Sequence, residues 1–424
     1  MSRPRLRTTK TAGPDTCTAA IVTAITPVPE WPRPRRCCSG DRISTIESPN
    51  RKEICSMSQE SAGEPSIDLD GLFTEFDTGS LRLRNRFAMA PMTRVKSPGG
   101  VPNSENIEYY REHAAGGVGL IITEGTYVRG PAAGPLSGVP RFYGQDSAVG
   151  WRAVAEAVHA EGAAIVPQLW HTGVDRGNEP EFEPQTPSVS PSGIDHAGAP
   201  VGRALTADDL DTLVASYVES AVLARQLGFD GIEIHGAHGY LLDQFFWDAT
   251  NHRTDDYGVT PRRRAAFPAR VVAAVREAVG PDFPIIYRYS QWKGVDYTAR
   301  IAATPGELEE LLTPLVDAGV DIFHTSLRRH WLPEFTDYAE DLSLAGWTKK
   351  ITGRPVITVG SVGVDSVFRG DQIDETQADR FRFLNEQFDR GEFDVVALGR
   401  ALLADPEWVN KVRDQRLSEI TPFR

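Results

Sequence analysis

The chain has 424 residues, of which 40% are hydrophobic and 24% charged, which is enough for one large barrel or two medium domains. Its formal net charge of −13 argues against a nucleic-acid partner and against binding to an acidic membrane surface. No apolar run is long enough to span a bilayer, so we expect no membrane partner and a cytoplasmic protein.

The first part of the chain differs in composition from the rest. Residues 1–56 hold ten Lys or Arg against five Asp or Glu, a net charge of +5, and they also hold every cysteine: Cys17, Cys37, Cys38 and Cys55. This stretch is rich in Arg, Pro and Ser and lacks helical or strand periodicity. It predicts a disordered basic extension over residues 1–66.

The origin of this extension has several interpretations. We favour a start assigned too far upstream, with Met57 as the working initiator; a targeting peptide and a cysteine metal knuckle are the alternatives. The remainder contains no cysteine, which excludes a disulfide, a thiolate nucleophile and cysteine ligands for an iron–sulfur cluster there.

Strand and helix signals alternate over residues 67–424. Residues 72–85 alternate around Asp77-Thr78-Gly79, which predicts a hairpin that closes the bottom of a barrel. Short apolar runs then begin near Phe87, Leu120, Ile165, Ile232, Ile285, Ile322, Val356 and Val395. This rhythm predicts an α/β fold, a TIM (β/α)8 barrel with an N-terminal hairpin cap.

The clearest helix follows Thr206. Thr206 and Asp209 form an N-cap pattern, and Gly228 suits the end of the helix. In a TIM barrel the chemistry lies at the C-terminal ends of the strands, so the residues after each apolar run are the candidates.

The most informative strand end is His235-Gly236-Ala237-His238-Gly239-Tyr240, which follows the predicted buried strand 231–234. Two imidazoles and a phenol can hydrogen-bond a carbonyl oxygen and supply a proton. The alternatives are a zinc site, for which a third ligand is missing from the loop, and a buried structural role for His238.

The other strand ends also carry recognisable segments. They are Ala90-Pro91-Met92-Thr93-Arg94, Thr123-Glu124-Gly125-Thr126, Gln168-Leu169-Trp170-His171, Tyr287-Arg288-Tyr289-Ser290, Thr358-Val359-Gly360-Ser361-Val362-Gly363 and Ala397-Leu398-Gly399-Arg400-Ala401-Leu402. In this order they resemble the old yellow enzyme family of FMN-dependent ene reductases, the NADH:flavin oxidoreductases, over roughly residues 70–410.

The resemblance implies a bound FMN. Pro91, Met92 and Thr93 would run beside the flavin, with the Thr93 hydroxyl donating to flavin O4. Gly125 would let the backbone approach the ring. Gln168 would pair with the pyrimidine edge, unless its amide only satisfies backbone groups of the loop.

The resemblance also implies sites for the charged parts of FMN. Arg288 would stabilise negative charge at the N1–C2 edge of the reduced flavin, unless it forms an ion pair within the barrel. Gly360, Ser361, Gly399 and Arg400 would bind the phosphate, at the usual phosphate site of this fold.

The implied reaction is a two-step transfer from NADH or NADPH through FMN to an enone or enal. His235 and His238 would bind the carbonyl oxygen, and Tyr240 would protonate the α-carbon. A redox-neutral isomerase, a biosynthetic desaturase and a non-catalytic flavin-binding protein are the alternatives. The sequence specifies neither the natural substrate nor the oligomeric state.

Some positions depart from the family pattern. Val259 stands where the family commonly has Gly, Arg263 where it has Asn, and residues 291–293 where a Pro often follows Ser. We expect Trp292, Trp331 and Phe335 to shape the substrate pocket, unless they pack the rim of the barrel.

Overall fold

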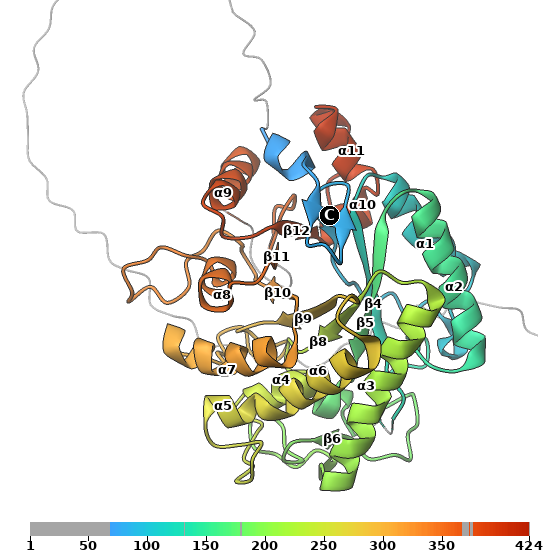
Figure 1. Ribbon diagram of the computed structural model, residues 1–424, viewed down its shortest axis with the longest axis vertical. Helices are drawn as coiled ribbons and strands as arrows, with labels where there is room; N and C mark the ends of the chain where they lie inside the picture. Colours follow the sequence, from blue (N-terminus) through green and yellow to red (C-terminus); the bar gives the residue numbers. More distant parts are fainter. Residues whose placement is uncertain (1–67, 131, 179, 367–372, 374–375, 424) are drawn as a thin grey trace, which may run out of the picture. The chain divides into compact units, whose positions relative to one another are not determined.

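The computed structural model describes residues 68–423 except 131, 179, 367–372 and 374–375. The predicted basic extension over residues 1–66, with Met57 and all the cysteines, lies outside the described residues. The described part contains a closed barrel of parallel strands in the order β10-β11-β12-β3-β4-β5-β8-β9 (Figure 1). This arrangement confirms the predicted TIM barrel.

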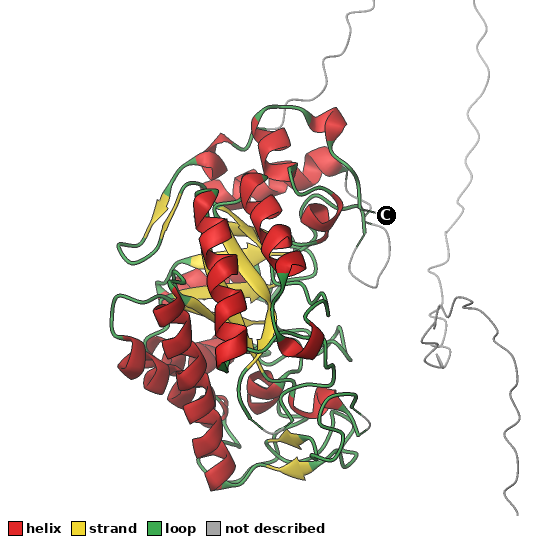
Figure 2. Ribbon diagram, turned by 90° about the vertical axis from the view of Figure 1, so that its right-hand side faces the viewer, coloured by secondary structure: helices red, strands yellow, loops and turns green. Residues whose placement is uncertain are grey.

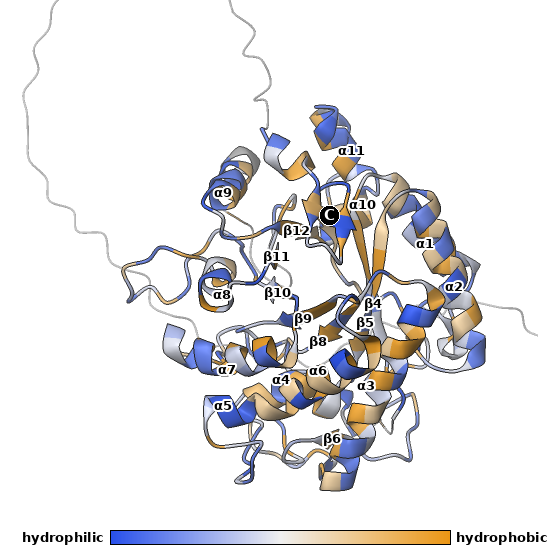
Figure 3. Ribbon diagram, in the orientation of Figure 1, coloured by the Kyte–Doolittle hydropathy of each residue, from blue (hydrophilic) through white to orange (hydrophobic). Residues whose placement is uncertain are grey.

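Each predicted apolar run coincides with a barrel strand. The strands are β3 (Phe87–Met89), β4 (Leu120–Tyr127), β5 (Ala164–Trp170), β8 (Ile232–His235), β9 (Ile285–Tyr289), β10 (Ile322–Ser326), β11 (Val356–Val359) and β12 (Val395–Leu398). Nearly all of their residues are buried, because one face fills the barrel and the other packs against helices. Figure 3 accordingly shows strands such as β8 and β9 in hydrophobic colours.

Helices surround the barrel strands (Figure 2). They are α1 (Ser104–Ala115), α2 (Gln145–Ala160), α3 (Ala207–Leu227), α4 (Leu241–Phe246), α5 (Pro261–Arg264), α6 (Ala266–Val279), α7 (Pro305–Ala318), α8 (Leu344–Thr352), α9 (Gln377–Asp389), α10 (Arg400–Ala404) and α11 (Trp408–Arg413). Among the described helices, none is both long enough and apolar enough to cross a membrane.

The predicted helix after Thr206 is confirmed as α3. The Thr206 hydroxyl accepts the Asp209 N–H at 3.3 Å, and the Asp209 carboxylate accepts the Thr206 N–H at 2.8 Å. Gly228 ends the helix with a φ of 87°, a left-handed conformation that glycine adopts without steric cost.

The predicted hairpin cap is also present. Strand β1 (Phe76–Asp77) pairs antiparallel with β2 (Arg82–Leu83). The side chains of Phe76, Leu81 and Leu83 join the apolar cluster that fills the barrel interior. Because the hairpin precedes β3, it closes the N-terminal end of the barrel and leaves the C-terminal end for the site.

Candidate active site

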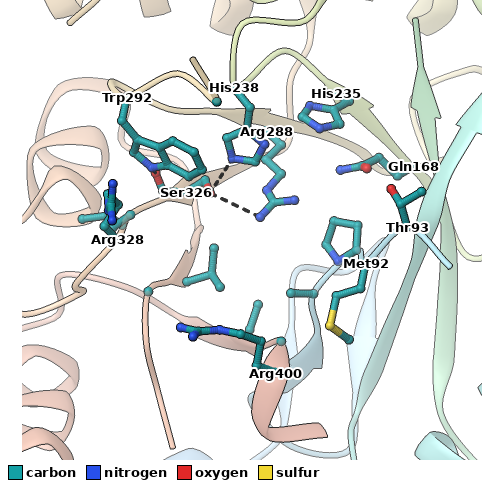
Figure 4. A pocket seen from close by; sticks show the side chains of 18 of the residues that line it. Met92, Thr93, Gln168, His235, His238, Arg288, Trp292, Ser326, Arg328 and Arg400 are labelled. Atoms are coloured by element: carbon teal, nitrogen blue, oxygen red, sulfur yellow. Dashed lines mark hydrogen bonds between the residues drawn. The ribbon is translucent and has the colours of Figure 1, made fainter. Parts of the chain in front are cut away.

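A cavity of about 700 Å³ lies at the C-terminal ends of the barrel strands (Figure 4). Nearly all of the predicted site residues line it: Pro91, Met92, Thr93, Gln168, His235, His238, Tyr240, Arg288, Gly360, Ser361, Gly399 and Arg400. They come from the ends of β3, β5, β8, β9, β11 and β12 or from the residues that follow. The closed parallel barrel brings together groups that are up to about 300 residues apart in sequence.

Gly125 is the predicted residue that does not line the cavity. A Cβ atom at this position would lie 2.5 Å from the indole of Trp170, so the glycine makes room for that ring. Trp170 itself lines the cavity. The close approach therefore involves a neighbouring side chain, and Gly125 shapes the cavity wall indirectly.

A buried polar network fixes the orientation of Gln168. Its amide Nε2 donates to Glu233 Oε1 at 2.7 Å, and Glu233 Oε2 lies 2.6 Å from His324 Nδ1. Glu233 and His324 are fully buried. Because Glu233 occupies one N–H of the Gln168 amide, the amide oxygen and the second N–H remain available to a ligand.

Arg288 places a positive charge inside the cavity. Its Nη2 donates to Ser326 Oγ at 3.3 Å, whereas its buried Nε has no hydrogen-bond partner among the described residues. Burial lowers the pKa of the guanidinium, and the nearby Glu233 opposes that shift. The Glu233 carboxylate hydrogen-bonds Gln168 and His324, and among the described residues no carboxylate lies within ion-pair distance of Arg288.

His235 is held in one tautomer by its backbone. The Ala237 N–H points to His235 Nδ1 at 3.3 Å, so Nδ1 is the acceptor and Nε2 carries the proton. Burial lowers the pKa of His235 well below its ordinary value, and the Arg288 charge lowers it further. A neutral imidazole with a free N–H is a suitable hydrogen-bond donor to a carbonyl oxygen.

His238 and Tyr240 lie close to His235. The centroid of the His235 ring is 5.2 Å from that of His238 and 5.0 Å from that of Tyr240. His238 Nε2 lies 2.8 Å from Ser326 Oγ, and Trp292 stacks on its ring at 4.4 Å. Burial lowers the pKa of His238 well below its ordinary value, with Arg288 as the next cause.

The cavity wall contains residues that the sequence did not single out: Trp170, Asp175, Tyr297, Ser326 and Arg328. Trp170 and Ser326 could have been found, because Trp170 is two residues from Gln168 on the same strand face and Ser326 ends β10.

Of the three aromatic residues predicted to shape the substrate pocket, one lines the cavity and two do not. Trp292 lines the cavity as expected. Trp331 and Phe335 do not line it, because Trp331 stacks on Phe383 and Phe335 packs against Trp347. For these two the alternative, packing at the barrel rim, is the correct one.

The end of the cavity away from Gln168 and His235 is cationic (Figure 4). Arg400 donates to the Ser366 carbonyl at 2.7 Å, and burial and the charge of Arg328 lower its pKa. The Ser361 hydroxyl donates to the Arg328 carbonyl at 2.6 Å, which ties the loop after β10 to the loop after β11. This end can accept an anion.

The comparisons with known proteins identify the family. The profile of the NADH:flavin oxidoreductase / NADH oxidase family matches residues 71–419. The chain belongs to this family. The family binds FMN, and the predicted resemblance to old yellow enzymes is therefore confirmed.

Individual relatives agree with this assignment. The chain is 35% identical over 358 residues to NADH oxidase of Thermoanaerobacter brockii, covering 82% of this chain but only 52% of that protein. It is 31% identical to 12-oxophytodienoate reductase 7 of Oryza sativa subsp. japonica, covering 81% of this chain and 87% of the relative. The structure of morphinone reductase in complex with tetrahydroNAD superposes with a TM-score of 0.68 at 30% identity, covering 81% and 91% of the two chains.

The residues present fit FMN. The orphaned, buried Arg288 Nε needs an acceptor, and the Gln168 amide offers both an acceptor and a donor to a flavin pyrimidine edge. At the other end of the cavity, the cationic Arg400 lies with Gly360, Ser361 and Gly399, and this end can accept the phosphate. Pro91, Met92 and Thr93 line the same cavity.

Proposed function

We propose that this flavin oxidoreductase uses NADH or NADPH to reduce the C=C bond of α,β-unsaturated carbonyl compounds, enones or enals. The observation that carries the proposal is the convergence of two neutral imidazoles and a phenol on the cavity that also holds Gln168, Arg288 and Arg400. Carbonyl binding, proton donation and flavin binding are thus available at one place.

In this proposal the protein binds FMN through the polar edges of the flavin ring and through the phosphate. Gln168 and Thr93 bind the polar edges of the flavin, Arg288 stabilises negative charge on it, and Arg400 binds the phosphate. When bound, FMN accepts a hydride from the nicotinamide and supplies a hydride to the substrate.

His235 and His238 bind the carbonyl oxygen. As that oxygen gains negative charge during reduction, N–H donors placed in a water-poor cavity stabilise it more than they stabilise the neutral carbonyl. The lowered pKa values of His235 and His238 keep both imidazoles neutral near neutral pH, so their charge does not change in that range.

Tyr240 supplies the proton to the α-carbon. Its ring is fixed edge-on by Trp170, with centroids 4.9 Å apart at 76°, and by His235 at 84°. A phenol is protonated at neutral pH and can therefore act as a general acid. The 12-oxophytodienoate reductase relative, whose name denotes reduction of an unsaturated ketone, supports this substrate class.

Steady-state oxidation of NADH and NADPH, with and without 2-cyclohexenone, tests the proposal. We expect coenzyme oxidation under anaerobic conditions to depend on the enone and to yield cyclohexanone. A protein that binds FMN but shows no enone-dependent oxidation of either coenzyme, and instead isomerises or desaturates its substrate, would contradict it.

A further inference from the structure

A fully buried ion pair lies directly behind the substrate-side residues. Lys293 Nζ is 2.6 Å from Asp243 Oδ2 and 2.7 Å from Oδ1, and both side chains are 0% exposed. Asp243 belongs to the short helix α4, which begins just after Tyr240, and Lys293 belongs to the segment after β9. The pair therefore joins the segments that follow two neighbouring barrel strands.

Stability alone is a weak reason for such a pair. Both charges are shielded from water, and this burial raises the pKa of Asp243 and lowers that of Lys293. Replacing a buried ion pair by well-packed apolar side chains is often neutral for stability, whereas removing one partner is strongly destabilising.

The two charged groups bind the backbone around His238. Asp243 Oδ2 accepts the Gly239 N–H at 2.6 Å, and Lys293 Nζ donates to the Ser290 carbonyl at 3.1 Å. Ser290 Oγ in turn accepts the His238 N–H at 3.0 Å, and the Gly294 N–H donates to the His238 carbonyl at 2.9 Å. Both peptide groups of His238 are thus tied to segments that the ion pair joins.

This backbone needs to be held. His238 has a φ of 65° and Gly239 a φ of 89°, so two successive residues are left-handed and one of them carries a side chain. Such a conformation is sterically unfavourable for a residue with a Cβ and persists only where the surroundings impose it. The turn directs the His238 imidazole toward Ser326 and Arg288 (Figure 4) and leads into Tyr240.

We infer that Lys293 and Asp243 are a positioning pair, which holds the left-handed turn at His238 and Gly239 and so places His238 and Tyr240 against the substrate; the inference rests on the proposed function. His235 is independent of the pair, because it belongs to β8 and lies in register with Arg288 of β9. Loss of the pair should therefore impair the handling of the substrate more than the binding of FMN.

Paired replacements separate positioning from stability. The double variant Lys293→Met/Asp243→Leu removes both charges and the acceptor of the Gly239 N–H. The double variant Lys293→Met/Asp243→Asn removes the charges but keeps an oxygen for that N–H. The matched control is Lys349→Met/Asp394→Leu, which removes another Lys–Asp ion pair. Asp394 also accepts a backbone N–H, that of Val356, but this pair lies at the N-terminal ends of the barrel strands, away from the cavity.

The readouts are the FMN dissociation constant, the rate at which saturating 2-cyclohexenone reoxidises the reduced flavin, and the affinity for 4-hydroxybenzaldehyde. For the Lys293→Met/Asp243→Leu variant (Met/Leu) we expect FMN affinity to change less than about twofold. Reoxidation of the flavin by the enone should slow at least tenfold, and binding of 4-hydroxybenzaldehyde, a phenol, should weaken at least tenfold. The Lys293→Met/Asp243→Asn variant (Met/Asn) should recover part of the reoxidation rate and part of the phenol affinity, but both should stay at least threefold below those of the wild type. The control should change neither.

The inference is overturned if the Met/Leu protein reoxidises and binds the phenol as the wild type does. If Met/Leu does not fold, Met/Asn decides, and wild-type values for it overturn the inference. Failure of the proposed function looks different, because the wild type itself would then not be reoxidised by the enone. Phenol affinity still tests the pair in that case, since it needs no turnover.

Discussion

Glu124 gives the protein a pH dependence that can be calculated from its surroundings. The residue lies within β4 and is 2% exposed, and its Oε2 accepts the Arg94 N–H at 2.9 Å. Burial raises its pKa from 4.5 to about 7, and the hydrogen bonds from the Arg94 and Val95 backbone oppose that shift. In the unfolded chain the carboxyl returns to its ordinary pKa.

The sign follows from proton binding. Between pH 4.5 and 7 the folded protein holds a proton at Glu124 that the unfolded chain has lost, so the raised pKa contributes stability at low pH. This contribution is complete below pH 4.5 and is lost as the pH rises through about 7. With about 1.4 kcal/mol for each pH unit, the free energy of unfolding should fall by about 2–3 kcal/mol between pH 5 and pH 8 from this group.

Glu124→Gln isolates the contribution, because glutamine keeps an oxygen for the Arg94 N–H and does not titrate. Urea unfolding of both proteins at saturating FMN, in steps from pH 5 to pH 8, gives the difference in free energy of unfolding. We expect the wild type to lose about 2–3 kcal/mol relative to the variant over this range. A difference that does not vary with pH would refute the reasoning, since Glu124 would then titrate alike in both states.

Three further predictions concern the backbone, the acid and the extension. Val259 has a φ of 71° and is 63% exposed, so Val259→Gly should relieve backbone strain and raise the free energy of unfolding in urea by up to about 1 kcal/mol. The control Val149→Gly changes an equally exposed valine, 64% exposed, within the helix α2, and should lower the free energy of unfolding. Tyr240→Phe should slow reoxidation of the flavin by enones by roughly 10²–10⁴-fold while reduction by NAD(P)H stays near normal in stopped-flow traces, because only the former needs a proton on carbon. Deleting residues 1–56 should leave FMN content and activity unchanged, and a large fall in melting temperature would contradict this.

The fold could be predicted because its signals are local. A strand of a TIM barrel is buried on both faces, so its core appears in the sequence as a continuous apolar run, as at 120–122 and 285–287. The residues that follow such runs must meet at one rim of the barrel. Pattern and topology together therefore predicted where His235 and Arg288 lie relative to each other.

The parts that could not be predicted depend on contacts between distant segments. Glu233 binds His324 across 91 positions, and Lys293 binds Asp243 across 50, and no spacing rule links either pair. Gly125 was assigned to the flavin, but the side chain that occupies the space beside it comes from another strand. For Trp331 and Phe335, the course of a long loop decided which aromatic ring lines the cavity.

We propose that one cavity binds FMN and passes electrons from a nicotinamide to a carbon–carbon double bond. An anaerobic single-turnover experiment tests this proposal: the FMN-loaded protein is reduced with one equivalent of NADPH or NADH and then mixed with 2-cyclohexenone. We predict that the flavin absorbance returns and that about one equivalent of cyclohexanone forms for each flavin. A flavin that stays reduced, or returns to the oxidised form while the enone is recovered unchanged, would contradict the account.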